Sequence, residues 1–192
     1  MDNTEQLDVQ EWTISSQEIE IQMKNVFVNA FSASYRKIAE GQDVKSVFGI
    51  TDELDDFLDA AYDSVFAKVK QNPDIYTVYI CGNSQNSVVG IAIFCSDSMG
   101  DEEVILDQLA VDPNFWHRGI AKHLIFQILS KRKSTQKIHL MSRRINHQAI
   151  RLYQKLGFKE SDFKYGHYNL SQFVGYTLDV KLLEAQTQNS NC

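Results

Sequence analysis

The segment that most restricts the fold is VILDQLAVDPNFWHRGIAKHLI, Val104–Ile125, which changes character near its middle. Its first eight residues predict a strand, and the apolar spacing from Gly119 to about Lys133 predicts a helix. A strand–turn–helix unit exposes the free N–H groups of the helix N-terminus, which attract anions. Gly119 lets an anion approach the backbone without a Cβ in the way, although a glycine here also fits an ordinary tight turn.

The other patterns predict an α/β or α+β domain with a mixed sheet. One domain is expected over residues 12–183, between a flexible segment 1–11 and a disordered tail 184–192. The expected helices are Ser16–Ile38, a second one that Thr51 caps and Pro73 ends, Gly119–Lys133, and one with Asn146 as N-cap and Gly157 after its end. The expected strands are Ile75–Cys81, Val88–Cys95, Val104–Val111 and Lys137–Arg143, with a closing hairpin of Phe158–Asn169 and Val174–Leu182 and a short strand near Trp12–Ser15.

Charge is unevenly distributed along the chain. Residues 1–110 carry 20 acidic and 6 basic side chains, a net charge of −14, and residues 111–192 carry 5 acidic and 13 basic ones, a net charge of +8. A basic half suggests a bound polyanion, although solvated faces would give the same count. Few aromatic residues lie among the basic ones, so we expect a compact phosphorylated cofactor and no nucleic acid.

Neither membrane insertion nor secretion is expected. The longest apolar run, Val88–Cys95, has eight residues and cannot span a bilayer. The N-terminus is acidic and polar, unlike a secretory signal. Three cysteines show neither metal spacing nor a disulfide framework, so we expect a reduced, cytoplasmic protein without a metal.

A second informative segment is NHQAIRLYQKLGF, Asn146–Phe158. Helical spacing places Ala149, Leu152, Tyr153 and Leu156 on one face. Packing would hold the ring of Tyr153, while its hydroxyl needs a partner. Periodicity alone favours a core tyrosine bonded to a carbonyl over a functional one.

Together, LAVDPNFWHRGIAKHLI and NHQAIRLYQKLGF resemble two motifs of the GNAT superfamily of N-acetyltransferases. The first is similar to the acyl-CoA pyrophosphate motif Gln/Arg-x-x-Gly-x-Gly/Ala, with Trp116 at the usual Gln or Arg position, so one phosphate contact is missing or is supplied by His117 or Arg118. The second matches Asn-x-x-Ala-x-x-Leu-Tyr-x-x-x-Gly-Phe at every position. The resemblance covers roughly Trp12–Leu182 and implies a mixed, mostly antiparallel central sheet flanked by helices, with a splayed strand pair that holds acyl-CoA.

The resemblance also implies an activity: transfer of an acetyl group from acetyl-CoA to a primary amine by direct attack. Backbone groups of Leu109–Val111 would pair with the pantetheine, amides from Arg118 to Lys122 would bind the pyrophosphate, and Tyr153 would donate a proton to the departing thiolate. The implied cofactor-binding residues are Leu109, Ala110, Val111, His117, Arg118, Gly119, Ile120, Ala121, Lys122, Asn146, Ala149 and Tyr153.

The attacking amine must first lose a proton. Asp107 shares a strand face with Ile105 and Leu109 by the period-two rule, and a carboxylate among apolar neighbours needs a reason. Similar acetyltransferases often carry an acidic residue at this position, which makes Asp107 the candidate base. The alternative is a structural carboxylate paired with Arg143 or Arg144.

The acceptor is not specified by the sequence. Six acidic residues without a basic one among them, between Asp52 and Asp63, would favour a small cationic amine, or a lysine or N-terminal amine of a protein, if they border the acceptor site. A solvated acidic face is the alternative. A non-catalytic acyl-CoA-binding sensor or interaction module on the same fold also stays open, as does the choice between monomer and homodimer.

Overall fold

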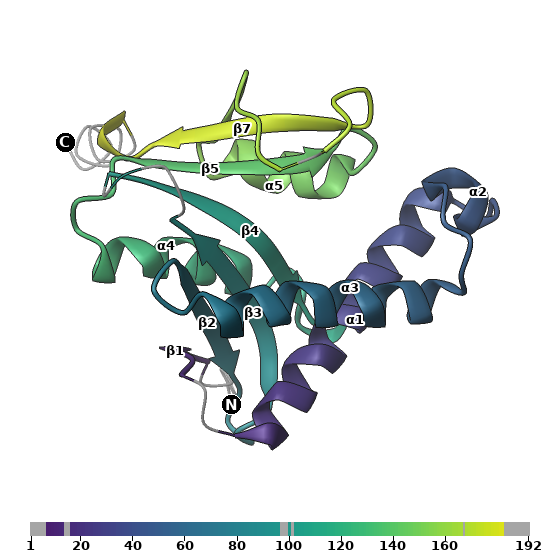
Figure 1. The fold of residues 1–192 in the computed structure, drawn as a ribbon, viewed down its shortest axis with the longest axis horizontal. Coiled ribbons are helices and arrows are strands. Elements are labelled where there is room, and N and C mark those ends of the chain that lie inside the picture. The colour runs from purple at the N-terminus through teal and green to yellow at the C-terminus, as the bar shows by residue number, and fades with distance from the viewer. Residues whose placement is uncertain (1–6, 14–15, 97–99, 101, 167, 183–192) are drawn as a thin grey trace, which may run out of the picture. The chain divides into compact units, whose positions relative to one another are not determined.

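The structure is a computed structural model that describes residues 7–13, 16–96, 100, 102–166 and 168–182. Within them a mixed seven-stranded sheet has the order β1-β2-β3-β4-β5-β7-β6 and is flanked by helices (Figure 1). This confirms the expected α/β class with a mostly antiparallel sheet. The elements are β1 (Asp8–Glu11), α1 (Gln17–Ala39), α2 (Val44–Phe48), α3 (Leu54–Gln71), β2 (Tyr76–Gly82), β3 (Val88–Cys95), β4 (Glu103–Val111), the 3₁₀ turn η1 (Pro113–Phe115), α4 (Ile120–Lys131), β5 (Lys137–Arg143), α5 (His147–Lys155), β6 (Lys159–Ser161) and β7 (Phe173–Asp179).

Two compact units divide the chain. The first comprises Met1–Ile93 and Gln108–Ile128, and the second comprises Phe94–Asp107 and Leu129–Cys192. The expectation of one domain over residues 12–183 stays a prediction. No helix of the described residues is both long and apolar enough to cross a membrane.

The core of the first unit lies where α1 and α3 pack together and against the strands. Phe27 of α1 meets Tyr62 of α3 edge to face, with ring centroids 5.6 Å apart, and Tyr62 stacks on Phe66 at 4.1 Å. Every residue of β3 is buried. The core residues are Trp12, Met23, Val26, Phe27, Ala30, Tyr62, Phe66, Val69, Val78, Ile80, Val88, Ile91, Ile93 and Ala110.

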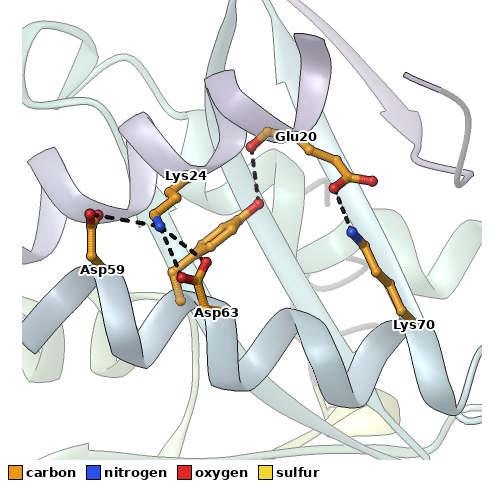
Figure 2. A network of polar contacts seen from close by, with 6 residues as sticks. Glu20, Lys24, Asp59, Asp63 and Lys70 are labelled. Atoms are coloured by element: carbon orange, nitrogen blue, oxygen red, sulfur yellow. Dashed lines mark hydrogen bonds and ion pairs between the residues drawn. The ribbon is translucent and has the colours of Figure 1, made fainter. Parts of the chain in front are cut away.

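Charged side chains join the outer faces of α1 and α3 (Figure 2). Lys24 Nζ lies 3.1 Å from Asp63 and 3.7 Å from Asp59, and Lys70 Nζ lies 2.6 Å from Glu20. Two further acidic residues between 52 and 63 are also paired, Asp55 with Arg36 at 3.6 Å and Glu53 with Lys45 at 2.7 Å. Much of the acidic stretch is therefore neutralised locally by basic residues of α1 and α2.

The start of α4 is fixed against β3 by a glycine. A Cβ at Gly90 would lie 2.9 Å from Ile120 Cγ2 and 3.0 Å from Leu124 Cδ1, closer than ordinary van der Waals contact. Ile120 and Leu124 are themselves almost completely buried. The absence of a side chain at Gly90 lets the first turn of α4 pack directly on β3.

In the second unit, β5 pairs along its whole length with β7, from Lys137 opposite Asp179 to Arg143 opposite Phe173. β6 extends this antiparallel pair through three residues. Asn146 caps α5, because its side chain accepts a hydrogen bond from the Ala149 N–H at 3.1 Å, and Gly157 follows the helix with a φ of 96°. Both expectations for the ends of this helix are confirmed.

A buried histidine links four strands of the second unit. His139 of β5 is 6% exposed. Its Nε2 lies 3.1 Å from Glu103 of β4, and its Nδ1 lies 2.9 Å from the Thr177 hydroxyl of β7. Thr177 Oγ1 in turn lies 2.9 Å from Ser161 Oγ of β6, and the ring of Phe163 stacks on the imidazole at 4.4 Å. Burial lowers the pKa of His139, and the nearby Glu103 carboxylate opposes this only in part.

This histidine predicts an acid-sensitive fold. The pKa of His139 in the folded state is below the ordinary value of 6.5, so the unfolded chain binds a proton at a higher pH than the folded chain does. The free energy of unfolding should therefore fall as the pH drops below 6.5. His139→Gln should flatten this dependence between pH 7 and 5 in chemical denaturation. An unchanged slope in His139→Gln would contradict this origin.

Several expected boundaries are wrong. α3 begins at Leu54 with Glu53 as its N-cap, so Thr51 is no cap and Asp52 lies outside the helix. The sequence also gave no sign of α2. The first arm of the closing hairpin has only three strand residues in place of Phe158–Asn169, and β7 ends at Asp179 before Leu182. Part of the segment expected to be flexible, Asp8–Glu11, pairs with β2, while residues 184–192 lie outside the described chain.

Candidate active site

The parallel pairing of β4 with β5 is short. It joins Glu103–Ile105 to Lys137–His139, and the described residues give no further pair in this ladder. β4 nevertheless continues to Val111. The cofactor-binding residues expected on this strand, Leu109, Ala110 and Val111, belong to this last part of β4.

The chain then makes a tight turn before α4. The Asp112 side chain accepts from the Asn114 N–H at 2.9 Å and starts η1. The Trp116 indole Nε1 donates to the Val111 carbonyl at 2.7 Å. His117 and Gly119 both have left-handed backbones, with φ values of 65° and 81°. These conformations bring the chain into the first turn of α4.

The N-terminus of α4 presents free hydrogen-bond donors. The first backbone bond into the helix runs from the His123 N–H to the Gly119 carbonyl at 3.1 Å. In the described part of the chain, the preceding N–H groups, from Gly119 to Lys122, have no acceptor. A Cβ on Gly119 would meet no atom within 4 Å, so the space beside it is open. Unsatisfied donors and the helix dipole together favour an anion here.

The basic side chains of this turn are arranged unequally. Arg118 lies over the ring of Phe115, 4.8 Å from its centroid, and its Nη2 donates to the Asn114 carbonyl at 3.3 Å. Its guanidinium thus packs back along η1. Lys122 is exposed and has no ion pair within the described residues. Lys122 is therefore the more available counter-charge for an anion at the helix.

Tyr153 of α5 is held by aromatic neighbours. Its ring lies edge-on to Phe158 at 5.8 Å and 6.5 Å from Tyr176. Desolvation raises the pKa of its hydroxyl to about 12. No described residue hydrogen-bonds to this hydroxyl, so the carbonyl-bonded core tyrosine that periodicity favours is not what the structure shows.

Asn146 and Ala149 bond to each other in the cap of α5. Their expected contacts with the cofactor stay predictions. The matching Asn and Ala of the motif have at least this local role: they start the helix that carries Tyr153.

Asp107 lies half-buried on β4. The two arginines proposed as its structural partners have other contacts, since Arg143 stacks over Phe173 at 4.9 Å and Arg144 Nε donates to the Leu170 carbonyl at 3.2 Å. Asp107 itself has an interaction within the protein. The choice between base and structural carboxylate therefore stays open.

No group of three or more His, Cys, Asp or Glu side chains among the described residues could hold a metal ion.

Comparison with known proteins decides the family. The sequence model for the acetyltransferase (GNAT) family matches residues 44–158, more than half of the chain. The chain belongs to the GNAT acetyltransferase family. The turn from Asp112 to Gly119 and α5 both fall within the matched residues.

Solved GNAT structures have the same fold. The PaiA N-acetyltransferase of Thermoplasma acidophilum in complex with coenzyme A is 15% identical, with a TM-score of 0.68 over 91% of this chain and 99% of that one. The ribosomal-protein-S18-alanine N-acetyltransferase of Escherichia coli is 16% identical, with a TM-score of 0.56 over 91% and 94%. A GNAT-family acetyltransferase of Staphylococcus aureus Mu50 is also 16% identical, with a TM-score of 0.61 over 91% and 99%. At these identities the likeness establishes the fold alone.

Two features of the turn between β4 and α4 were not predicted from the sequence. The bond from Trp116 to Val111 was not expected, although Trp116 stood out as a departure from the motif. The packing of Arg118 on Phe115 was not expected either, and an Arg three residues after an aromatic residue was its only signal.

Proposed function

We propose that this GNAT protein transfers the acetyl group of acetyl-CoA to a primary amine by direct attack. The observation that carries the proposal is the set of free N–H groups from Gly119 to Lys122 at the open N-terminus of α4. The diphosphate of coenzyme A is an anion of the right kind for these donors. The thioester of the bound cofactor supplies the acyl group.

The residues of the turn fit this cofactor. Open space beside Gly119 leaves room for phosphate oxygens, and Lys122 adds a positive charge. The last residues of β4, Leu109–Val111, have backbone groups that can pair with the amides of the pantetheine arm. The Val111 carbonyl already accepts one hydrogen bond from Trp116, which leaves one lone pair for a ligand.

Proton removal is assigned to Asp107. An alkyl ammonium has a pKa near ~10.4, so only about one molecule in a thousand is nucleophilic at pH 7. A carboxylate that accepts this proton, directly or through water, is typically worth ~10²–10⁴ in rate. Asp107 is half-buried on β4, the strand that carries Leu109–Val111.

Tyr153 acts on the departing thiolate as a hydrogen-bond donor. Its pKa of about 12 lies above that of a thiol, near ~8.5, so complete proton transfer from the phenol to the thiolate is unfavourable. A hydrogen bond from the phenol still stabilises the negative sulfur. The hydroxyl has no described protein partner that would compete for its proton.

Tyr153→Phe should therefore lower kcat only modestly, by about tenfold or less, the value of one hydrogen bond. The Tm should stay near that of the wild type, because the ring keeps its contacts with Phe158 and Tyr176. Tyr176→Phe is the matched control and should leave kcat unchanged. A large loss of Tm with normal kcat would make Tyr153 a structural residue instead.

The acidic residues of α3 do not define the acceptor. Asp55, Asp59 and Asp63 are paired with Arg36 and Lys24, so they provide little attraction for a cationic amine. The proposal therefore names a primary amine in general, either a small cationic amine or a lysine or N-terminal amine of a protein. A cytoplasmic location and a single domain are part of the same proposal.

An amine panel tests the function. Thiol release from acetyl-CoA would be measured with a polyamine, an aminoglycoside, a lysine-containing peptide and a peptide with a free N-terminus, and each acceptor would be checked by mass. Release that depends on one class of amine is expected. Binding of acetyl-CoA by calorimetry without release for any amine would instead support a non-catalytic sensor.

A further inference from the structure

The indole of Trp116 joins two parts of the proposed cofactor site. It follows η1 directly and is half-buried. Its Nε1 donates to the Val111 carbonyl at 2.7 Å, across five residues of chain. This hydrogen bond closes the turn onto the end of β4, the strand segment assigned to the pantetheine.

The residues after Trp116 need such a restraint. His117 carries a Cβ yet has a left-handed backbone, with a φ of 65°, and Gly119 follows with a φ of 81°. Residues with a Cβ adopt this region only under strain or when the surrounding structure holds them there. The directions of the N–H groups from Gly119 onward depend on these two backbone conformations.

The other side of the turn is held independently. Ile120 is 1% exposed and packs where Gly90 lacks a side chain. The segment with the free N–H groups is therefore held at two places. Trp116, just before it, bonds to the end of β4, and Ile120, within it, packs on β3. Without the hydrogen bond from Trp116 to Val111, the turn would be held only through α4 and the cap at Asp112.

We propose that Trp116 is a positioning residue that holds the N–H groups of Gly119–Lys122 in the arrangement that binds a diphosphate. The inference rests on the proposed function, because it takes coenzyme A as the ligand of these donors. Trp116 acts by preorganisation: a turn already in its bound conformation loses less entropy when the ligand binds. The departure at Trp116 from the usual Gln or Arg thus changes how the turn is supported, while the backbone donors stay in place.

Trp116→Phe tests this inference, because it keeps an aromatic ring and removes the N–H donor. We expect coenzyme A to bind about tenfold more weakly by calorimetry, the effect of one well-placed hydrogen bond. KM for acetyl-CoA should rise by a similar factor with kcat unchanged, since the lost contact serves ground state and transition state alike. With acetyl-pantetheine, which lacks the diphosphate, the loss of kcat/KM should be clearly smaller than with acetyl-CoA.

Two further variants complete the test. Trp12→Phe replaces a buried indole, whose N–H has no partner in the described residues, by a smaller ring that fills the core less well. It should therefore lower the Tm without changing the affinity for coenzyme A. Trp116→Gln keeps a side-chain N–H and should bind coenzyme A more tightly than Trp116→Phe.

The outcomes separate the two proposals. Wild-type protein that does not bind coenzyme A would overturn the proposed function. If the wild type binds coenzyme A and Trp116→Phe and Trp116→Gln bind it as tightly as the wild type does, only the role of Trp116 would be overturned. Equal losses of kcat/KM with acetyl-CoA and acetyl-pantetheine would also overturn it, because the effect would then not concern the diphosphate.

Discussion

Acetyl-CoA is expected to raise the Tm of the wild-type protein, and Gly119→Val is expected to abolish this stabilisation. A ligand present at a hundred times its Kd stabilises a fold by about 2.7 kcal/mol, a rise in Tm of about 5–10 °C for a chain of this size. Valine would place methyl groups in the open space beside the backbone and strain a position whose φ is 81°. Thermal unfolding with and without acetyl-CoA measures both effects.

Gly41→Val is the matched control for the strain. Gly41 has a φ of 85°, and a Cβ there would also meet nothing within 4 Å, but the residue lies in the turn after α1. Both variants should lose stability to a similar extent, about 1–3 kcal/mol for a strained backbone. Only Gly119→Val should lose the response to acetyl-CoA, and an undiminished response in that variant would place the phosphates elsewhere.

Asp107→Asn is expected to lower turnover at neutral pH by roughly 10²–10⁴, the usual contribution of a general base. Activity should recover as the pH approaches the pKa of the amine, because the free amine then needs no enzymic deprotonation. Acetyl-CoA binding and the Tm should change little. kcat/KM from pH 6 to 10, together with the Tm, decides the role of this residue.

If Asp107 is instead a structural residue, Asp107→Asn should give the opposite results for stability and for the effect of high pH. The variant would lose stability, by about 3–5 kcal/mol if a buried ion pair is broken on one side, and high pH would not restore its activity. Glu102→Gln, at an exposed position just before β4, is the control for the loss of one negative charge and should behave like the wild type. A stable variant with an unreduced, flat profile would exclude both roles.

The sequence predicted those elements whose signals are local. The β3 and β5 strands have the expected bounds because a run of β-branched and apolar residues ends at polar ones in each case. Asn146 and Gly157 mark α5 because an N-cap and a left-handed residue after the helix are set by neighbours in the chain. The order of the longer elements follows from such signals, whereas the mostly antiparallel sheet was implied by the resemblance to the GNAT superfamily.

Long-range contacts explain what was missed. The first arm of the closing hairpin was expected to run from Phe158 to Asn169, but the pairing of β6 ends at Ser161, and Phe163 stacks on His139 from another strand. Thr51 was a good cap by type, yet α3 begins only at Leu54, which is buried. A residue pattern does not state which distant side chain will occupy a position.

The same difference between local signals and long-range contacts applies to the candidate site. The donors at Gly119–Lys122 could be predicted because a helix N-terminus leaves its first N–H groups free whatever surrounds it. The bond from Trp116 to Val111 and the position of Arg118 over Phe115 could not, because both depend on how the intervening η1 turn is folded. The free hydroxyl of Tyr153 likewise follows from its surroundings and not from its helical spacing.

The packing of α4 on Gly90 has a consequence for local unfolding. Proteins open in cooperative parts, and hydrogen exchange of a backbone amide reports the free energy of the opening that exposes it. Because Ile120 and Leu124 are pressed on β3, a strand buried throughout, the start of α4 cannot fray without disturbing the core. Amides in the second turn of α4 should therefore exchange almost as slowly as those of β3, even when the protein has no ligand.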